Sequence, residues 1–252
     1  MIFGRNRHVR HEQVVLPEQL KDERDLAAEA SAAPADDGAR GPHDIAARPG
    51  TTGYIDLGGL RVRAVQGMKL RLDVEEATQR IVAATVTVGK SALQVQAFSA
   101  PRAAGLWDDL RAELKDSLAQ NAGANVQEQD GPFGPELLTR VPAPMPDGSP
   151  GWNVARFVGV DGPRWFVRGV FHGEAAFQPE AAEALERVFS ELVVVRGDGP
   201  LPPRDLLPLR PPADAHPVQR RRRAEGAAPA DAKRAASGES LPERGPEITE
   251  IR

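Results

Sequence analysis

The chain has 252 residues, no cysteine, 27% charged residues and a formal net charge of −4 at pH 7. The lack of cysteine excludes disulfide frameworks, thiolate zinc sites, iron–sulfur ligation and cysteine nucleophiles. No apolar run approaches the roughly 18 to 20 residues that span a bilayer, and no apolar stretch follows the basic start as it would in a secretory signal. We therefore expect a cytoplasmic protein with no membrane partner.

Composition divides the chain into four parts. Residues 1–42 are basic and then acidic and alanine-rich, so burial of their few large side chains cannot offset the chain entropy lost on folding. Residues 43–198 hold most of the β-branched and aromatic residues and are long enough to form a single domain with its own core. We expect disorder in residues 1–42, one folded domain over 43–198, an extended proline-rich segment over 199–212, and a disordered charged tail over 213–252.

The first half of the domain has the alternating pattern of half-buried strands. Residues 55–65 alternate loosely and residues 69–74 alternate cleanly between apolar and polar side chains. Residues 81–88 and 93–97 are separated by a short turn at Gly89 and Lys90, which predicts a β-hairpin.

The pattern then changes to that of a helix. Residues 106–118 place leucines on one stripe, with acids in the first turn and a glycine at 123 to end the helix. Residues 131–135, with the sequence GPFGP, are too rich in turn formers for regular structure and predict a rigid connector. A strand is expected over residues 136–141.

The last part of the domain predicts a hairpin and a second helix. Residues 153–160 and 165–171 flank Asp161-Gly162, a strong hairpin signal. A helix is expected to start at Pro179, and residues 193–195 either continue it or form a short strand.

Strands in hairpin runs with two helices indicate an α+β fold. We predict an antiparallel sheet built from hairpins, with two amphipathic helices packed on it and disordered termini. A parallel doubly wound sheet is excluded because it needs a helix between most successive strands.

Several stretches together match the pattern of one family. They are IDLGGLRV from residue 55, SALQVQAFSAPRAAGLWDDLR, GPFGPELLTRVP, ARFVGVDGPRWFVRGVF and VVVRGDGPLPPRDLLPLR. Over roughly residues 43–210 the chain closely resembles a family of uncharacterised actinobacterial proteins, the domain of unknown function 3710 family. The resemblance implies a cytoplasmic protein, often encoded near a deoxyuridine triphosphate hydrolase and a small OB-fold nucleic-acid-binding protein. The resemblance implies no particular reaction, cofactor or catalytic residue.

The residues favour no catalytic or metal chemistry. His172 is the only histidine within residues 53–198, which hold nearly all the β-branched and aromatic residues, so a serine triad would have to use it with Ser91, Ser99, Ser117 or Ser190. None of these serines stands in a G-x-S-x-G motif. Histidines and acids show no metal-ligand spacing, and the sequence VGKS at 88–91 lacks the upstream glycine of a phosphate-binding loop. We assign no catalytic residue, no metal and no cofactor.

The leading hypothesis is a non-enzymatic module that binds an unidentified protein partner. Polar residues interleaved with apolar ones mark the sheet face away from the core, and rigid loops often carry function. Trp165 and Phe166 point to opposite faces, so one can lie in the core while the other forms an exposed platform. The candidate ligand or partner surface comprises Gln94, Gln96, Phe133, Arg156, Arg164, Trp165, Arg168 and His172.

The alternative is a protein associated with nucleotides or nucleic acid. Three arginines of the 153–171 hairpin, Arg156, Arg164 and Arg168, could hold phosphate. Basic residues of the termini could contact nucleic acid weakly. The acidic domain and the pI of about 5.8 weigh against this alternative. The candidate nucleic-acid contacts are Arg220, Arg221, Arg222 and Arg223.

Overall fold

The computed structural model describes residues 9–14, 41–102, 105–145 and 148–213. The disorder expected for 213–252 and for most of 1–42, and the nucleic-acid contacts expected at 220–223, lie outside the described residues.

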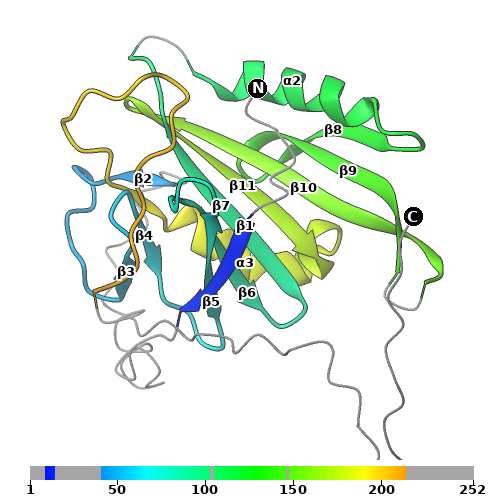
Figure 1. Cartoon of the computed structure of the whole chain (residues 1–252), viewed down its shortest axis with the longest axis horizontal. Coiled ribbons are helices and arrows are strands. Elements are labelled where there is room, and N and C mark those ends of the chain that lie inside the picture. Colours follow the sequence, from blue (N-terminus) through cyan, green and yellow to red (C-terminus); the bar gives the residue numbers. More distant parts are fainter. Residues whose placement is uncertain (1–8, 15–40, 103–104, 146–147, 214–252) are drawn as a thin grey trace, which may run out of the picture. The chain divides into compact units, whose positions relative to one another are not determined.

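The fold is organised around an eight-stranded sheet in which every pair of neighbouring strands is antiparallel (Figure 1). The strand order is β1-β5-β6-β7-β11-β10-β9-β8. In chain order the strands are β1 (Val9–Val14), β5 (Lys69–Glu75), β6 (Ile81–Val88), β7 (Ser91–Ser99), β8 (Asn125–Gly131), β9 (Gly134–Pro144), β10 (Pro150–Gly162) and β11 (Trp165–Gly173).

A smaller four-stranded sheet has the order β2-β12-β4-β3. Its short strands are β2 (His43–Asp44), β3 (Tyr54–Asp56), β4 (Leu60–Arg63) and β12 (Val193–Val194). The pairing of β2 with β12 is parallel, whereas β12–β4 and β3–β4 are antiparallel. Residues 193–194 thus form a strand, one of the two outcomes left open by the sequence.

Helix α3 (Pro179–Ser190) lies on one face of the large sheet (Figure 1). Its proline occupies the first turn, where the missing amide is not needed for helix hydrogen bonding. Leu185 and Phe189 of this helix are fully buried in one apolar cluster with Val95 and Phe171 of the sheet. We call this cluster the main core; the small sheet contributes Leu60 and Val62 to it.

Helix α2 (Trp107–Ala119) packs on the opposite face of the large sheet, over β8, β9 and β10. A second buried cluster joins Leu110 and Leu114 of the helix to Leu137 and Phe166 of the sheet. Gly159 of β10 makes this approach possible, because a Cβ there would lie 2.3 Å from the indole of Trp107.

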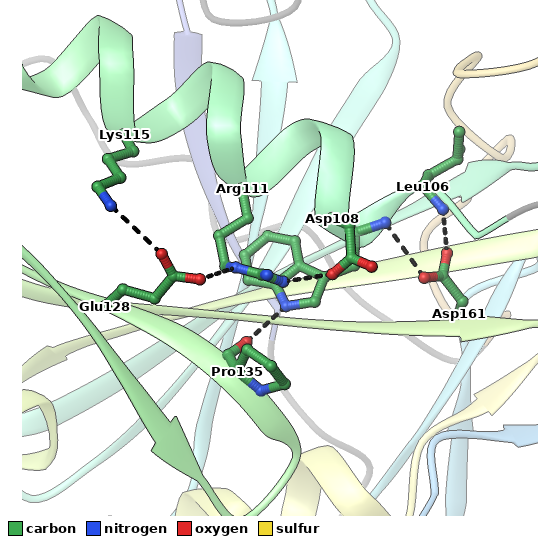
Figure 2. Close-up of polar contacts among 8 residues, drawn as sticks. Leu106, Asp108, Arg111, Lys115, Glu128, Pro135 and Asp161 are labelled. Atoms are coloured by element: carbon green, nitrogen blue, oxygen red, sulfur yellow. Dashed lines mark hydrogen bonds and ion pairs between the residues drawn. The ribbon is translucent and has the colours of Figure 1, made fainter.

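Polar contacts fix the position of α2 (Figure 2). The Trp107 indole donates to the carbonyl of Pro135 at 2.6 Å. Arg111 donates to Asp108 of its own helix and to Glu128 of β8, each at 2.7 Å, and Lys115 donates to Glu128 at 3.3 Å. The helix is therefore held to the sheet by both apolar burial and ion pairs.

The predicted α+β architecture is confirmed, but two turns differ from their expected positions. Residues 131–135 are not an irregular connector: Gly131 pairs with Gly134, so Pro132 and Phe133 form the two-residue loop of the β8–β9 hairpin. Strand β8 was missed because its polar sequence NVQEQDG lacks apolar alternation.

The second turn lies two residues beyond Asp161-Gly162. Gly162 pairs with Trp165, so both residues of that dipeptide belong to β10 and the loop is formed by Pro163 and Arg164. Gly162 is required where it stands, since a Cβ there would lie 2.1 Å from the Trp165 indole.

Two segments placed outside the domain by composition belong to its body. Strand β1 pairs with β5 at the edge of the large sheet, from Val9↔Glu75 to Val14↔Leu70. The proline-rich segment after residue 199 lies beside β7, where the Leu207 amide donates to the Ala97 carbonyl at 2.9 Å. Leu207 is buried in the main core. Among the described residues, no helix has the length and apolar character needed to cross a membrane.

Candidate binding face on the large sheet

Polar side chains gather on the face of the large sheet that points away from the main core. In β7, Leu93 and Val95 point into the main core, so Gln94 and Gln96 point to the other face. Paired residues of neighbouring strands share a face, which places residues of β1, β5, β6 and β11 beside these glutamines. We call this group the polar face; it comprises His11, Arg71, Asp73, Thr85, Gln94, Gln96, Arg168 and His172.

Helix α2 covers the other part of the same sheet face. It contacts β8, β9 and β10, and it reaches one end of β7 and β11 through Phe98 and Phe166. Within the described part of the chain, no helix lies over the polar face.

Asp73 is the centre of the polar face. Its side chain is only 1% exposed, yet four side chains donate hydrogen bonds to its carboxylate. The donors are His11 Nδ1 at 2.7 Å, Gln94 Nε2 at 2.8 Å, Thr85 Oγ1 at 3.0 Å and Arg71 Nε at 3.1 Å. A buried carboxylate is tolerated when its oxygens are satisfied in this way. The network therefore ties together β1, β5, β6 and β7.

A second polar pair holds Arg168 in place. Arg168 Nη2 donates to Gln96 Oε1, and Gln96 Nε2 donates in turn to the Val82 carbonyl at 3.0 Å. The guanidinium carbon lies 5.9 Å from the ring centroid of Phe98. Burial lowers the pKa of Arg168 to about 10, so the group still carries its positive charge at neutral pH. Arg168 is thus a desolvated cation with a fixed orientation.

His172 is partly buried beside the positive charge of Arg71, and both favour its neutral form. Burial, and next the positive charge of Arg71, lower its pKa below the ordinary value of 6.5. Among the described residues no hydrogen bond joins His172 to a serine or a carboxylate.

Three of the four candidate serines form hydrogen bonds with the backbone. Ser91 Oγ accepts the Ala175 amide, while Ser99 and Ser190 donate to backbone carbonyls. Ser117 lies on the exposed side of α2. In the described ranges there is also no group of three or more His, Asp or Glu side chains that could hold a metal.

The structure brings four of the predicted surface residues together, namely Gln94, Gln96, Arg168 and His172. The other four lie elsewhere, and two of the predictions were wrong about exposure. Trp165 is 2% exposed, and its indole donates to Asp44 at 2.8 Å. Phe166 is also fully buried, under α2, so neither ring forms an exposed platform.

Arg156 is the second buried residue among the predicted surface set. It lies on the main-core side of the sheet, 3.5 Å from Glu136 and 2.5 Å from Glu186 of α3, and its guanidinium lies 4.4 Å from the Phe171 ring centroid. Burial raises the pKa of Glu136 in this cluster. Arg156 is therefore an internal ion-pair partner.

The three hairpin arginines do not form one phosphate site. Arg168 pairs with Gly159, whereas Arg156 pairs with Phe171, an odd offset that puts their side chains on opposite faces. Arg164 lies in the loop between the strands with a positive φ of 66°. Phe133, also in a hairpin loop, packs edge-on against Phe189 with centroids 4.8 Å apart.

Four members of the polar face, His11, Arg71, Asp73 and Thr85, were not among the predicted site residues. Aspartate is depleted in β-strands, so an aspartate in the middle of a strand draws attention to its position. Asp73, between Leu72 and Val74 in a cleanly alternating strand, was thus the available sequence signal. His11 had none, because its segment was expected to be disordered.

Comparison with known proteins identifies the family. Residues 41–217 match the family described as Protein of unknown function (DUF3710). The chain belongs to the DUF3710 family. The family resemblance carried by the sequence motifs is thereby confirmed. No curated protein and no solved structure matches the chain. The DUF3710 region contains the whole polar face except His11, which lies N-terminal to it.

Proposed function

We propose that this chain is a cytoplasmic, non-enzymatic interaction module that binds an acidic segment of a partner protein on the polar face. The observation that carries the proposal is the balance of exposed donors and acceptors there. Asp73, the one carboxylate of the group, is buried and already accepts four hydrogen bonds. Glu75, two residues further along β5, accepts the Thr78 hydroxyl at 2.6 Å. The exposed groups of the polar face are the guanidinium of Arg71 and the imidazole of His11.

The donors of the polar face differ in their exposure. The side chains of Arg71 and His11 are 42% and 54% exposed. Arg168 is more enclosed and retains its charge. Carboxylates of an acidic segment would form charge-assisted hydrogen bonds with Arg71 and His11, and such bonds are about twice as strong as neutral ones. The positive charge of Arg168 beneath them adds to the attraction.

The side chains are also held in place before a partner arrives. Gln96 orients Arg168, and Asp73 orients Arg71 and Gln94. Binding then freezes fewer rotamers, so less conformational entropy is lost than on an ordinary solvated strand face. This pre-organisation supports a binding role for the face.

A catalytic role has less support. General-base catalysis needs a base within about 2.6 to 3.2 Å of the group that it deprotonates. Among the described residues no hydrogen bond joins His172 to a candidate serine, and Ser91, Ser99 and Ser190 bond to backbone groups instead.

The experiment is a peptide-binding titration with the full chain. A short fluorescein-labelled peptide of glutamate and glycine is titrated beside lysine–glycine and serine–glycine peptides of equal length, at low and at moderate salt. We expect saturable binding of the glutamate peptide alone, weakened by salt because the contacts are partly exposed.

Variants locate the binding site. Arg71→Gln should weaken binding of the glutamate peptide roughly tenfold, because one charge-assisted contact is lost. Arg140→Gln, on the exposed side of β9, is the matched control and should bind as the parent does. Thermal unfolding of both variants checks that they fold. Equal affinity for all three peptides, or unchanged affinity in a folded Arg71→Gln variant, would contradict the proposal.

A further inference from the structure

A hollow of about 330 Å³ lies between the loop after β5, strand β1 and the C-terminal segment around residues 208–211. Three arginines line it, Arg10, Arg80 and Arg210, together with one acid, Glu12. Apolar lining includes Ile81 and Leu209. Arg10 and Glu12 alternate with His11 along β1, so the hollow opens on the other side of this strand from the polar face.

The walls of the hollow are fixed by contacts between segments far apart in the sequence. Leu209 forms β-bridges to both Gly58 and Ile81. The Arg210 amide donates to the Leu57 carbonyl at 2.9 Å, and its side chain crosses Gly58, where a Cβ would lie 3.0 Å from Arg210 Cγ. The C-terminal wall therefore follows a defined path.

The opposite wall is held by a small polar network. Arg10 Nη2 donates to Glu12 Oε1 at 2.5 Å and to Gln79 Oε1 at 3.4 Å. Gln79 has a positive φ of 56°, and its Nε2 donates to the Glu76 carbonyl at 2.8 Å, which turns its oxygen toward Arg10. Arg10 is thereby oriented at the edge of the hollow.

The lining carries an excess of positive charge. Three guanidinium groups and one carboxylate leave a net charge of +2, and the nearby acids Glu75 and Glu76 do not line the hollow. Within the described residues, Arg80 and Arg210 form no ion pair. Their charges are available to a ligand.

We propose that this hollow binds a small phosphate monoester. Its phosphate would be held by Arg80 and Arg210, and its apolar part would rest on Ile81 and Leu209. A phosphate monoester carries a charge of about −1.5 to −2 at pH 7, which matches the lining. A planar guanidinium group can donate two parallel hydrogen bonds to two oxygens of one phosphate. The volume of the hollow falls within the range of small-molecule sites.

Isothermal titration calorimetry of the full chain tests the proposal with three probes: phenyl phosphate, inorganic phosphate and benzoate. We expect phenyl phosphate to bind most tightly, because inorganic phosphate lacks the apolar part and benzoate lacks the second negative charge. Arg80→Gln and Arg210→Gln should each weaken phenyl phosphate roughly tenfold through the loss of charge-assisted hydrogen bonds. Arg140→Gln, remote on β9, should leave the affinity unchanged.

Three results would overturn the proposal. They are no saturable binding of phenyl phosphate at millimolar concentration, phenyl phosphate binding no tighter than inorganic phosphate or benzoate, and unchanged affinity in Arg80→Gln. Arg80 is exposed, so this variant is expected to fold even where Arg210→Gln disturbs the C-terminal wall.

Discussion

The carboxylate of Asp161 accepts the backbone amides of both Leu106, at 2.6 Å, and Trp107, at 3.1 Å (Figure 2). These residues lie 55 and 54 positions away in the chain. Asp161 thus supplies from β10 the cap that Leu106 does not provide for α2. Its negative charge also lies at the positive end of the helix dipole.

Asp161→Ala should lower the free energy of unfolding by about 1 to 2 kcal/mol, the usual effect of losing a helix cap. Chemical denaturation monitored by tryptophan fluorescence measures this change, because Trp107 lies at the start of the helix. Asp130→Ala is the matched control, since Asp130 is exposed on β8. Equal effects of the two substitutions would contradict a capping role.

Asp73→Asn should destabilise the fold by about 2 to 4 kcal/mol, because it removes the buried charge that four donors share. An asparagine side chain also turns one acceptor into a donor that faces other donors. Urea denaturation at neutral pH, with Asp130→Asn for comparison, measures the effect. A loss no larger than that of the control would show that the network contributes nothing to stability.

His172 should make stability depend on pH below about 6.5. Its folded-state pKa is lowered from 6.5 by burial and by Arg71, so the unfolded chain binds the proton more readily. The stabilising contribution is therefore complete above pH 6.5 and is lost as the pH falls toward the folded-state pKa.

His172→Gln isolates this contribution from that of the other histidines. Denaturation of the parent and the variant at several pH values yields a difference curve, which should change below pH 6.5 and be flat above it. A difference curve that is flat across the whole range would show that His172 does not titrate differently in the folded and unfolded chain.

Local patterns predicted most of the secondary structure correctly. The alternation in β7, with Leu93 and Val95 against Gln94 and Gln96, predicted both the strand and its two faces, since side chains in a strand point alternately to either side. The apolar stripe of α2 and the initial proline of α3 likewise predicted both helices. These signals depend on neighbours within a few residues.

The candidate sites were predicted only in part, because their residues meet across long stretches of chain. Gln94, Gln96, Arg168 and His172 were predicted as surface residues, but the sequence did not show that Asp73 meets donors from β1, β6 and β7 there. The hollow lined by Arg10, Arg80 and Arg210 was not predicted at all, because β1 and the C-terminal segment were assigned to parts outside the domain.

The sequence alone determined the family, through several motifs that together resemble it, and the fold class, through the local alternation and helical spacing of apolar residues. Only the tertiary structure decided which polar residues are buried and what they pair with. Arg156 is internal because α3 brings Glu186 to it, and Trp165 is internal because β2 brings Asp44, 121 residues away. Burial of a polar group depends on a partner that compensates its lost hydration, and that partner is set by strand register and packing.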